Sequence, residues 1–246
     1  VIADLNIGIL FTFGVVSLSV YGLVLAGYAA NSKYAFLGGI RSSAQMISYE
    51  IAMGMSVIPV FMMVSELNLS KIIAYQAENS WLVFPSSLHP IDLLLCGCML
   101  ISFGIFTVAA FAETNRLPFD LPEAETELVA GFNTEYGSMR FAIFFIAEYF
   151  AMIAGCAMIV VLFLGGWTLP FWGLDQPATN LWVGLAQILI FGLKTCIGVL
   201  VMIWVRWMLP RFRYDQLMDL GWCRILPLAL ANIVATALLI FWKYAG

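Results

Sequence analysis

Long apolar runs separated by short polar segments dominate this sequence. A helix needs about 20 mostly apolar residues to cross a bilayer, and inside lipid a helix satisfies its own backbone hydrogen bonds. The sequence therefore predicts an all-α polytopic transmembrane bundle in which residues 1–246 form a single domain. The six predicted spans are 7–30, 41–65, 90–112, 139–164, 180–205 and 222–243.

The composition agrees with a membrane protein and excludes several other classes. Hydrophobic residues make up 63% of the chain and charged residues 11%, against about 25% charged residues in an average soluble domain. A net charge of −4 argues against a nucleic-acid partner. One histidine, His89, and five cysteines without a C-x-x-C motif indicate no metal site, disulfide framework or iron–sulfur cradle.

The basic residues predict how the chain is oriented. Lys71 and Lys243 fall on one side, Lys194 lies within a span, and the other eight basic residues fall on the opposite side. Because lysine and arginine accumulate on the inner side of membranes, that second side is predicted to be cytoplasmic or matrix-facing, with both chain ends outside. The eight inner residues are Lys33, Arg41, Arg116, Arg140, Arg206, Arg211, Arg213 and Arg224.

Residues 113–138 form an acidic segment on this inner side, which includes "ETNRLPFDLPEAETELVAGFNTEY". These acids could simply be solvated, but two prolines and several apolar residues favour a segment packed on protein. Glu123 and Glu127 stand four residues apart, where like charges on one helix face repel. Partly buried acids of this kind can hold or pass protons near neutrality. The acids of the segment are Glu113, Asp120, Glu123, Glu125, Glu127 and Glu135.

Three ionisable residues fall inside predicted spans: Glu50, Glu148 and Lys194. Each costs about 3 kcal/mol at mid-bilayer unless it meets a partner or water. At about 1.5 Å per residue, the two glutamates lie roughly 12–13 Å from the inner side and Lys194 roughly 18 Å. One interpretation is an ion pair that only fixes helix packing. We favour a proton relay, flanked by Tyr49 and Tyr149, because two carboxylates accompany one lysine.

Three motifs, in order "GGIRSSAQMISYE", "ETNRLPFDLPEAETELVAGFNTEY" and "WVRWMLPRFRYDQLM", resemble those of the quinone-site membrane subunit of respiratory complex I. The resemblance extends over residues 3 to 243. That family normally has eight spans, and the first two are expected to be missing here. The six spans would then be unable to complete the quinone chamber alone.

The resemblance implies a core membrane subunit of proton-pumping NADH:quinone oxidoreductase, with quinone as substrate and no redox centre in this chain. FMN and iron–sulfur clusters would lie on partner subunits. The expected partners are peripheral-arm, small membrane and antiporter-like subunits, together with membrane lipid. The expected location is a bacterial cytoplasmic membrane or a mitochondrial inner membrane.

The resemblance also implies roles for individual residues. The three arginines of the last motif would contact segment acids, quinone headgroup or lipid phosphate. The expected quinone-chamber residues are Glu113, Arg116, Asp120, Phe141, Phe145, Arg206, Arg211 and Arg213. The expected proton-path residues are Tyr49, Glu50, Glu123, Glu125, Glu127, Glu148, Tyr149 and Lys194.

Two alternatives remain open at this stage. One is the homologous subunit of a membrane-bound hydrogenase or of a photosynthetic complex. The other is a stand-alone ion transporter, a class that tends to show inverted repeats, which this sequence does not display.

Overall fold

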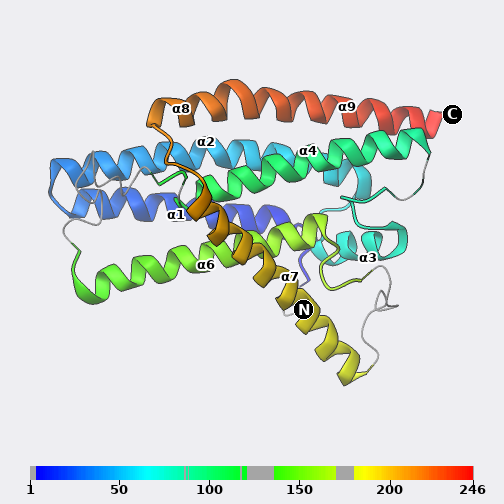
Figure 1. Ribbon diagram of the computed structural model, residues 1–246, viewed down its shortest axis with the longest axis horizontal. Helices are drawn as coiled ribbons and strands as arrows, with labels where there is room; N and C mark the ends of the chain where they lie inside the picture. Colours follow the sequence, from blue (N-terminus) through cyan, green and yellow to red (C-terminus); the bar gives the residue numbers. More distant parts are fainter. Residues whose placement is uncertain are drawn as a thin grey trace.

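The computed structural model describes residues 4–85, 87, 89–116, 118–120, 136–169 and 180–245, and this part of the chain is helical (Figure 1). Six helical stretches are long and apolar enough to span a membrane, which confirms the predicted all-α polytopic bundle. The elements are α1 (Gly8–Ala29), α2 (Lys33–Val64), α3 (Leu69–Asn79), α4 (Pro90–Glu113), α6 (Ser138–Phe163), α7 (Leu181–Met208), α8 (Tyr214–Asp219), the π-helical turn η2 (Leu220–Ile225) and α9 (Leu226–Ala245).

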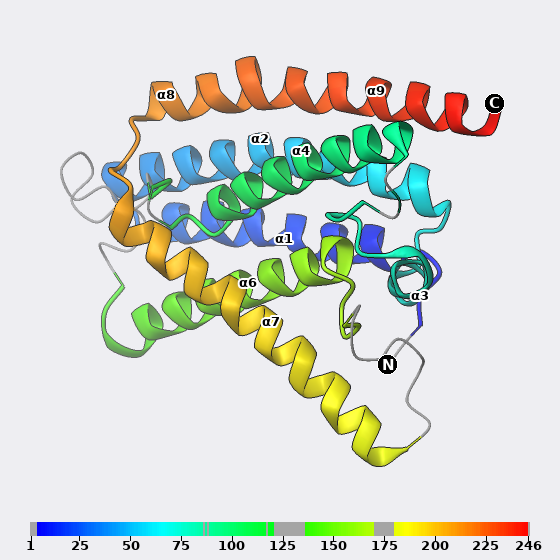
Figure 2. The same ribbon diagram turned by 45° about the vertical axis from the view of Figure 1, so that its right-hand side comes forward.

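Most of the long helices lie side by side, and α7 crosses them obliquely (Figures 1 and 2). Helix α2 is central because it packs against α1, α4 and α9. Helix α3 lies at one end of the bundle, where α2 ends and α4 begins (Figure 2). We call this the α3 end and call the other, where α4 ends and α6 begins, the loop end.

Two predicted boundaries and one connection differ from the structure. Helix α2 starts at Lys33 instead of 41, and the last spanning stretch starts at Tyr214 instead of 222. Apolar runs indicate where lipid begins, but a helix continues into water while its backbone bonds persist. Helix α3 was not predicted because it is too short to span. Its start is capped by Asn68, whose side chain accepts a 2.8 Å hydrogen bond from the Ser70 amide.

Two glycines allow α1 and α2 to approach closely. A Cβ atom at Gly27 would lie 2.8 Å from the carbonyl oxygen of Ala35, and one at Gly39 would lie 3.1 Å from that of Leu23. Small residues serve this purpose between membrane helices, where close packing substitutes for the hydrophobic effect. The α1–α2 contact therefore depends on the absence of side chains at these positions.

The last spanning stretch is attached to the core by polar contacts. In α9, Asn232 donates hydrogen bonds to the Cys98 carbonyl at 3.1 Å and to the Ser102 hydroxyl at 2.8 Å. In η2, Gly221 packs against the ring of Tyr49, which would lie 3.5 Å from a Cβ atom there. These contacts set the rotation of η2 and α9 relative to α2 and α4.

Candidate functional site

The candidate site lies at the loop end, where the acidic segment leaves α4. Gln45 is fully buried in α2 and donates two hydrogen bonds, to the Ala112 carbonyl at 2.8 Å and to the Phe119 carbonyl at 2.9 Å. One amide group thus joins the last turn of α4 to the start of the acidic segment. Sequence reasoning missed Gln45, although "RSSAQMIS" is an unusually polar stretch for a spanning helix.

Residues 118–120 are held from the opposite side by the α7–α8 connection. Arg211 forms an ion pair with Asp120 at 2.8 Å, and the Phe212 amide donates to the Pro118 carbonyl at 3.1 Å. The ring of Phe119 stacks on Phe212, with centroids 5.6 Å apart. The start of the acidic segment is therefore clamped between α2 and the residues before α8.

Tyr49 extends the same contact toward α8. Its ring lies 5.8 Å from that of Phe119, and its hydroxyl donates a 2.9 Å hydrogen bond to the Leu217 carbonyl. The preceding residue, Ser48, accepts a 3.1 Å hydrogen bond from the Trp222 indole. Tyr49 was predicted as a proton-path residue, and in the structure its hydroxyl proton is directed to a backbone oxygen.

A second set of predicted residues surrounds the first turn after α4. Arg116 forms an ion pair with Glu148 of α6, and both side chains are largely buried, at 11% and 19% exposed. The guanidinium carbon lies 4.4 Å from the ring centroid of Tyr149 and 5.9 Å from that of Phe145. The structure thus brings together four of the predicted site residues from two sequence regions.

The other membrane carboxylate, Glu50, lies where α1 and α2 meet. It accepts a hydrogen bond from the hydroxyl of Ser17, a contact that sequence reasoning missed because Ser17 sits in an otherwise apolar run. The carboxylate of Glu113, the last residue of α4, lies within electrostatic range of Glu50. Both intramembrane glutamates are therefore linked to the point where the acidic segment begins.

Comparison with known proteins identifies the family to which this chain belongs. A family model described as NADH dehydrogenase matches residues 1–237. The chain belongs to this family. It is 48% identical to NADH-quinone oxidoreductase subunit 8 of Rhodothermus marinus, over 97% of this chain and 69% of the relative. It is also 48% identical to an NADH-quinone oxidoreductase subunit of Paramagnetospirillum magneticum, over 96% of this chain and 63% of the relative.

An NADH-quinone oxidoreductase subunit of Geobacter metallireducens gives the same identity, 48%, over 97% of this chain and 62% of the relative. The chain therefore spans between 62% and 69% of the length of these NADH dehydrogenase family members. The matched part includes Glu50 and Glu148, the arginines Arg116 and Arg211, and the start of the acidic segment.

The alternative interpretation, an ion pair between Lys194 and a membrane glutamate, is wrong, and the place of Lys194 in the proton path stays a prediction. Lys194 does not join the membrane glutamates. Its ammonium donates to the carbonyls of Leu164 at 2.8 Å, Gly166 at 3.0 Å and Thr168 at 2.7 Å, and it lies 4.1 Å from the Trp81 ring centroid. These carbonyls follow the end of α6 at the α3 end of the bundle. Similar depth did not identify its partners, because depth along a helix does not specify which side chains meet, and α7 runs obliquely to the other long helices (Figure 1).

Apart from Arg206, the remaining predicted residues fall into three groups. Phe141 and Phe145 pack on each other in α6, with ring centroids 4.6 Å apart. Arg213 is exposed at the start of α8, where its amide donates to the Gln216 side chain at 3.3 Å. Three predicted acids lie outside the described residues: Glu123, Glu125 and Glu127.

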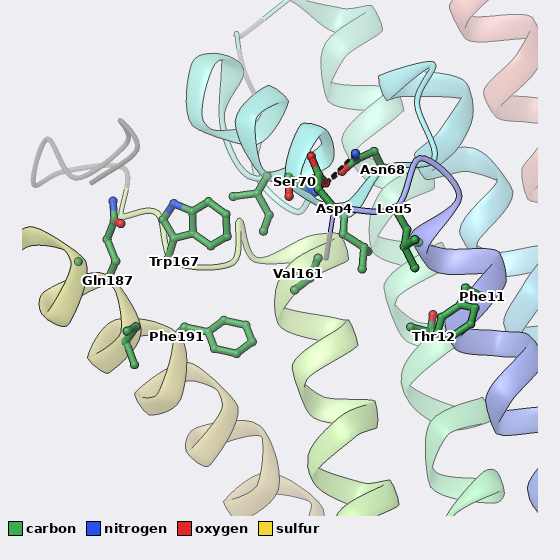
Figure 3. A pocket seen from close by; sticks show the side chains of 15 residues that line it. Asp4, Leu5, Phe11, Thr12, Asn68, Ser70, Val161, Trp167, Gln187 and Phe191 are labelled. Carbon is green, nitrogen blue, oxygen red and sulfur yellow. Dashed lines mark hydrogen bonds between the residues drawn. The ribbon is translucent and has the colours of Figure 1, made fainter. Parts of the chain in front are cut away.

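Two cavities among the described residues are large enough to bear on function. The larger, about 740 Å³, opens at the α3 end between α1, α3, α6 and α7, and Figure 3 shows Asp4 there hydrogen-bonded to Asn68. The smaller, about 180 Å³, lies at the loop end beside Arg116 and Tyr149 and also reaches Arg206. Of these two, the smaller cavity adjoins the candidate site.

Proposed function

We propose that this chain is a core membrane subunit of a proton-pumping NADH:quinone oxidoreductase. In this proposal it contributes part of the quinone chamber and the acidic path that couples quinone reduction to proton pumping. The names of the related proteins support this choice over the hydrogenase, photosynthetic and transporter alternatives. FMN and iron–sulfur clusters would belong to partner subunits of the peripheral arm, and antiporter-like subunits would lie alongside in the membrane.

One observation carries the proposal: each intramembrane glutamate is linked to the start of the acidic segment. Glu148 is linked directly, through its ion pair with Arg116. Glu50 is linked through the charge of Glu113 at the end of α4. A buried carboxylate is costly in lipid and marks a functional site by default.

The chemistry of quinone reduction fits such a layout. Reduction of a quinone to a quinol takes up two electrons and two protons, so negative charge develops in a site of low dielectric constant until the protons arrive. Changes of charge act strongly there, and interacting carboxylates titrate as a set rather than singly. Glu113 and Glu50 would respond to such a change on one side of α4, and Arg116 with Glu148 on the other.

The test replaces Glu148 with glutamine in the full-length protein within its assembled complex. We expect the complex to assemble, with quinone reductase activity lowered and fewer protons pumped per quinone reduced. Because Glu148→Gln alone leaves Arg116 buried without a counter-charge, the matched variant is the double substitution Arg116→Gln with Glu148→Gln. A wild-type proton-to-quinone ratio in the double variant would reduce the ion pair to a packing role and contradict the coupling function.

Membership of the complex is tested separately, by native electrophoresis of membranes solubilised in mild detergent. We expect the chain to migrate with a large assembly that has NADH:quinone reductase activity and contains cluster-bearing subunits identified by mass spectrometry. A small band without such partners would contradict the proposal at its first step.

A further inference from the structure

The carbonyl end of α6 is closed by side chains from two other helices. An α-helix leaves its last carbonyls without partners inside the helix, and within a membrane such groups must find partners in the protein. Gln76 of α3 donates to two of them. Lys194 of α7 donates to three that follow, the carbonyls of Leu164, Gly166 and Thr168. A single ammonium group therefore completes the end of this helix.

All the contacts that the structure gives Lys194 are with uncharged groups. They are the three carbonyl oxygens and the ring of Trp81, whose centroid lies 4.1 Å from the ammonium nitrogen. Among the described residues, no carboxylate forms an ion pair with it. The chain between Thr168 and Lys194 has one acid, Asp175, outside the described residues, and no base. That acid and the C-terminal end of the α6 dipole both favour a cation here.

The oxygens and the ring are held in place by contacts in which the lysine takes no part. Gly165 and Gly166 have φ angles of +69° and +56°, which glycine adopts readily. The Gly165 amide donates to the Gln76 side chain at 2.9 Å, and the Thr168 amide donates to the Gly165 carbonyl at 2.9 Å. The Trp81 indole donates to the Thr168 hydroxyl at 3.3 Å. The arrangement is therefore preformed and does not depend on the ion that it surrounds.

Distances and chemistry select the class of ion. The three oxygens lie 2.7–3.0 Å from the ammonium nitrogen, the range of N–H···O hydrogen bonds. Ca²⁺ needs oxygens at about 2.3–2.6 Å and Mg²⁺ at about 2.0–2.1 Å, so both divalent ions are too small for this arrangement. An aromatic face attracts ammonium groups. The arrangement thus suits an ion with one positive charge and several N–H donors.

We propose that the end of α6 and the ring of Trp81 form a binding site for a primary ammonium ion, which Lys194 fills as a tethered ligand. The lysine stem then ties α7 to α6 through this ion. Lys194→Ala removes the outer part of the stem and the ammonium group, which are the atoms that n-propylammonium contains. Because Lys194 is only partly buried, the free ion can enter the space and bind to the same oxygens.

The experiment uses the full-length protein in the assembly in which it is purified. Wild type and Lys194→Ala are heated with n-propylammonium, and the fraction of the chain that stays in solution is measured, which requires no enzymatic activity. We expect the ion to slow the loss of Lys194→Ala by roughly tenfold at about ten times its Kd, with saturation, and to leave wild type unchanged. Absence of protection in Lys194→Ala would overturn the proposal.

Two solutes of equal concentration, at matched ionic strength, separate charge from shape. The first, n-propanol, has a similar shape but no charge, and the second, tetramethylammonium, has the charge but no N–H donor. Neither should protect Lys194→Ala, and protection by either one equal to that by n-propylammonium would refute an ammonium site. Lys71→Ala removes an exposed lysine at the same end of the bundle, paired with Glu66. Equal protection of this control variant would also refute the site.

A second pair of variants tests the site with the lysine in place, in case Lys194→Ala does not assemble. Trp81→Phe keeps an aromatic face beside the ammonium group, whereas Trp81→Leu removes it, and both lose the indole donor. Trp81→Leu should be lost from solution several-fold faster than Trp81→Phe, because only the aromatic face attracts the cation. Equal rates for the two variants would contradict the assignment of Trp81 to the site.

Discussion

Arg211 lies 2.8 Å from the carboxylate of Asp120, although the two residues are far apart in the sequence. This ion pair joins the α7–α8 connection to the start of the acidic segment, beside the stacked rings of Phe119 and Phe212. The acidic segment is thus fixed at its beginning by both a charge contact and an aromatic contact.

Breaking the Arg211–Asp120 pair should loosen residues 118–120. Because the two side chains are 33% and 12% exposed, the pair should contribute about 1 kcal/mol, more than a fully exposed pair averages. A double-mutant cycle with Arg211→Gln and Asp120→Asn measures this coupling through hydrogen exchange of the peptide that covers residues 112–120. Additive effects of the two substitutions would show that the contact stabilises nothing.

Gln45→Met should release the same segment more strongly. The substitution keeps the side-chain length but removes the amide donor that the carbonyls of Ala112 and Phe119 share, at a cost of about 1–3 kcal/mol. We expect exchange in residues 112–120 to speed up by roughly tenfold or more. The matched control is Gln76→Met, because Gln76 donates to two carbonyls at the α3 end, Val161 at 3.0 Å and Leu162 at 3.1 Å. Equal acceleration at the loop end in both variants would contradict the local role of Gln45.

Lys194→Met should lower stability without changing the number of protons pumped per quinone. The variant loses three carbonyl contacts and the contact with Trp81, worth roughly 2–4 kcal/mol together. Faster thermal inactivation of the assembled complex is the expected result. Lys71→Met removes a lysine from an exposed pair with Glu66 at the same end and should have little effect. A fall in the proton-to-quinone ratio for Lys194→Met would return this residue to the proton path.

Gly27→Ala should disturb the α1–α2 contact, because its Cβ atom would meet a backbone oxygen at 2.8 Å. Backbone cannot move aside as a flexible side chain can, so we expect a loss of about 1–3 kcal/mol. Gly22→Ala, in the same helix but with nothing within 4 Å of the new atom, should be neutral or slightly stabilising. The thermal stabilities of the two variants are compared directly. Equal thermal stabilities of the two variants would contradict a close α1–α2 contact at Gly27.

Much of the fold could be predicted from the sequence because lipid imposes a simple rule on length and polarity. Apolar runs identified all six spanning helices. Helix α3 was not predicted, because its sequence shows only a cap and a short amphipathic pattern. A criterion for spanning segments does not detect either feature. The start of α2 was predicted too late in the sequence, because helical structure extends beyond the apolar run.

The candidate site was predictable in its charges but not in its contacts. Glu50 and Glu148 could be found because a charge within a span is rare, and Arg116 because it lies in the acidic-segment motif that carries the family resemblance. Gln45 and Ser17 are uncharged, and their roles depend on which backbone or carboxylate atoms the packing brings to them. Lys194 shows the converse: its charge was conspicuous, but its partners are carbonyl oxygens, which no sequence pattern specifies.

The π-helical turn η2 has a consequence for how chains of this family can differ in length. A π-helical turn holds one more residue than an α-helical turn would, so loss of one residue between Leu220 and Ile225 could leave a plain α-helix there. The contacts of Leu217 with Tyr49 and of Asn232 with Ser102 could both survive. The same loss between Leu226 and Asn232 would turn one part of the helix against the other by about 100°. Insertions and deletions among family members should therefore be concentrated at this turn.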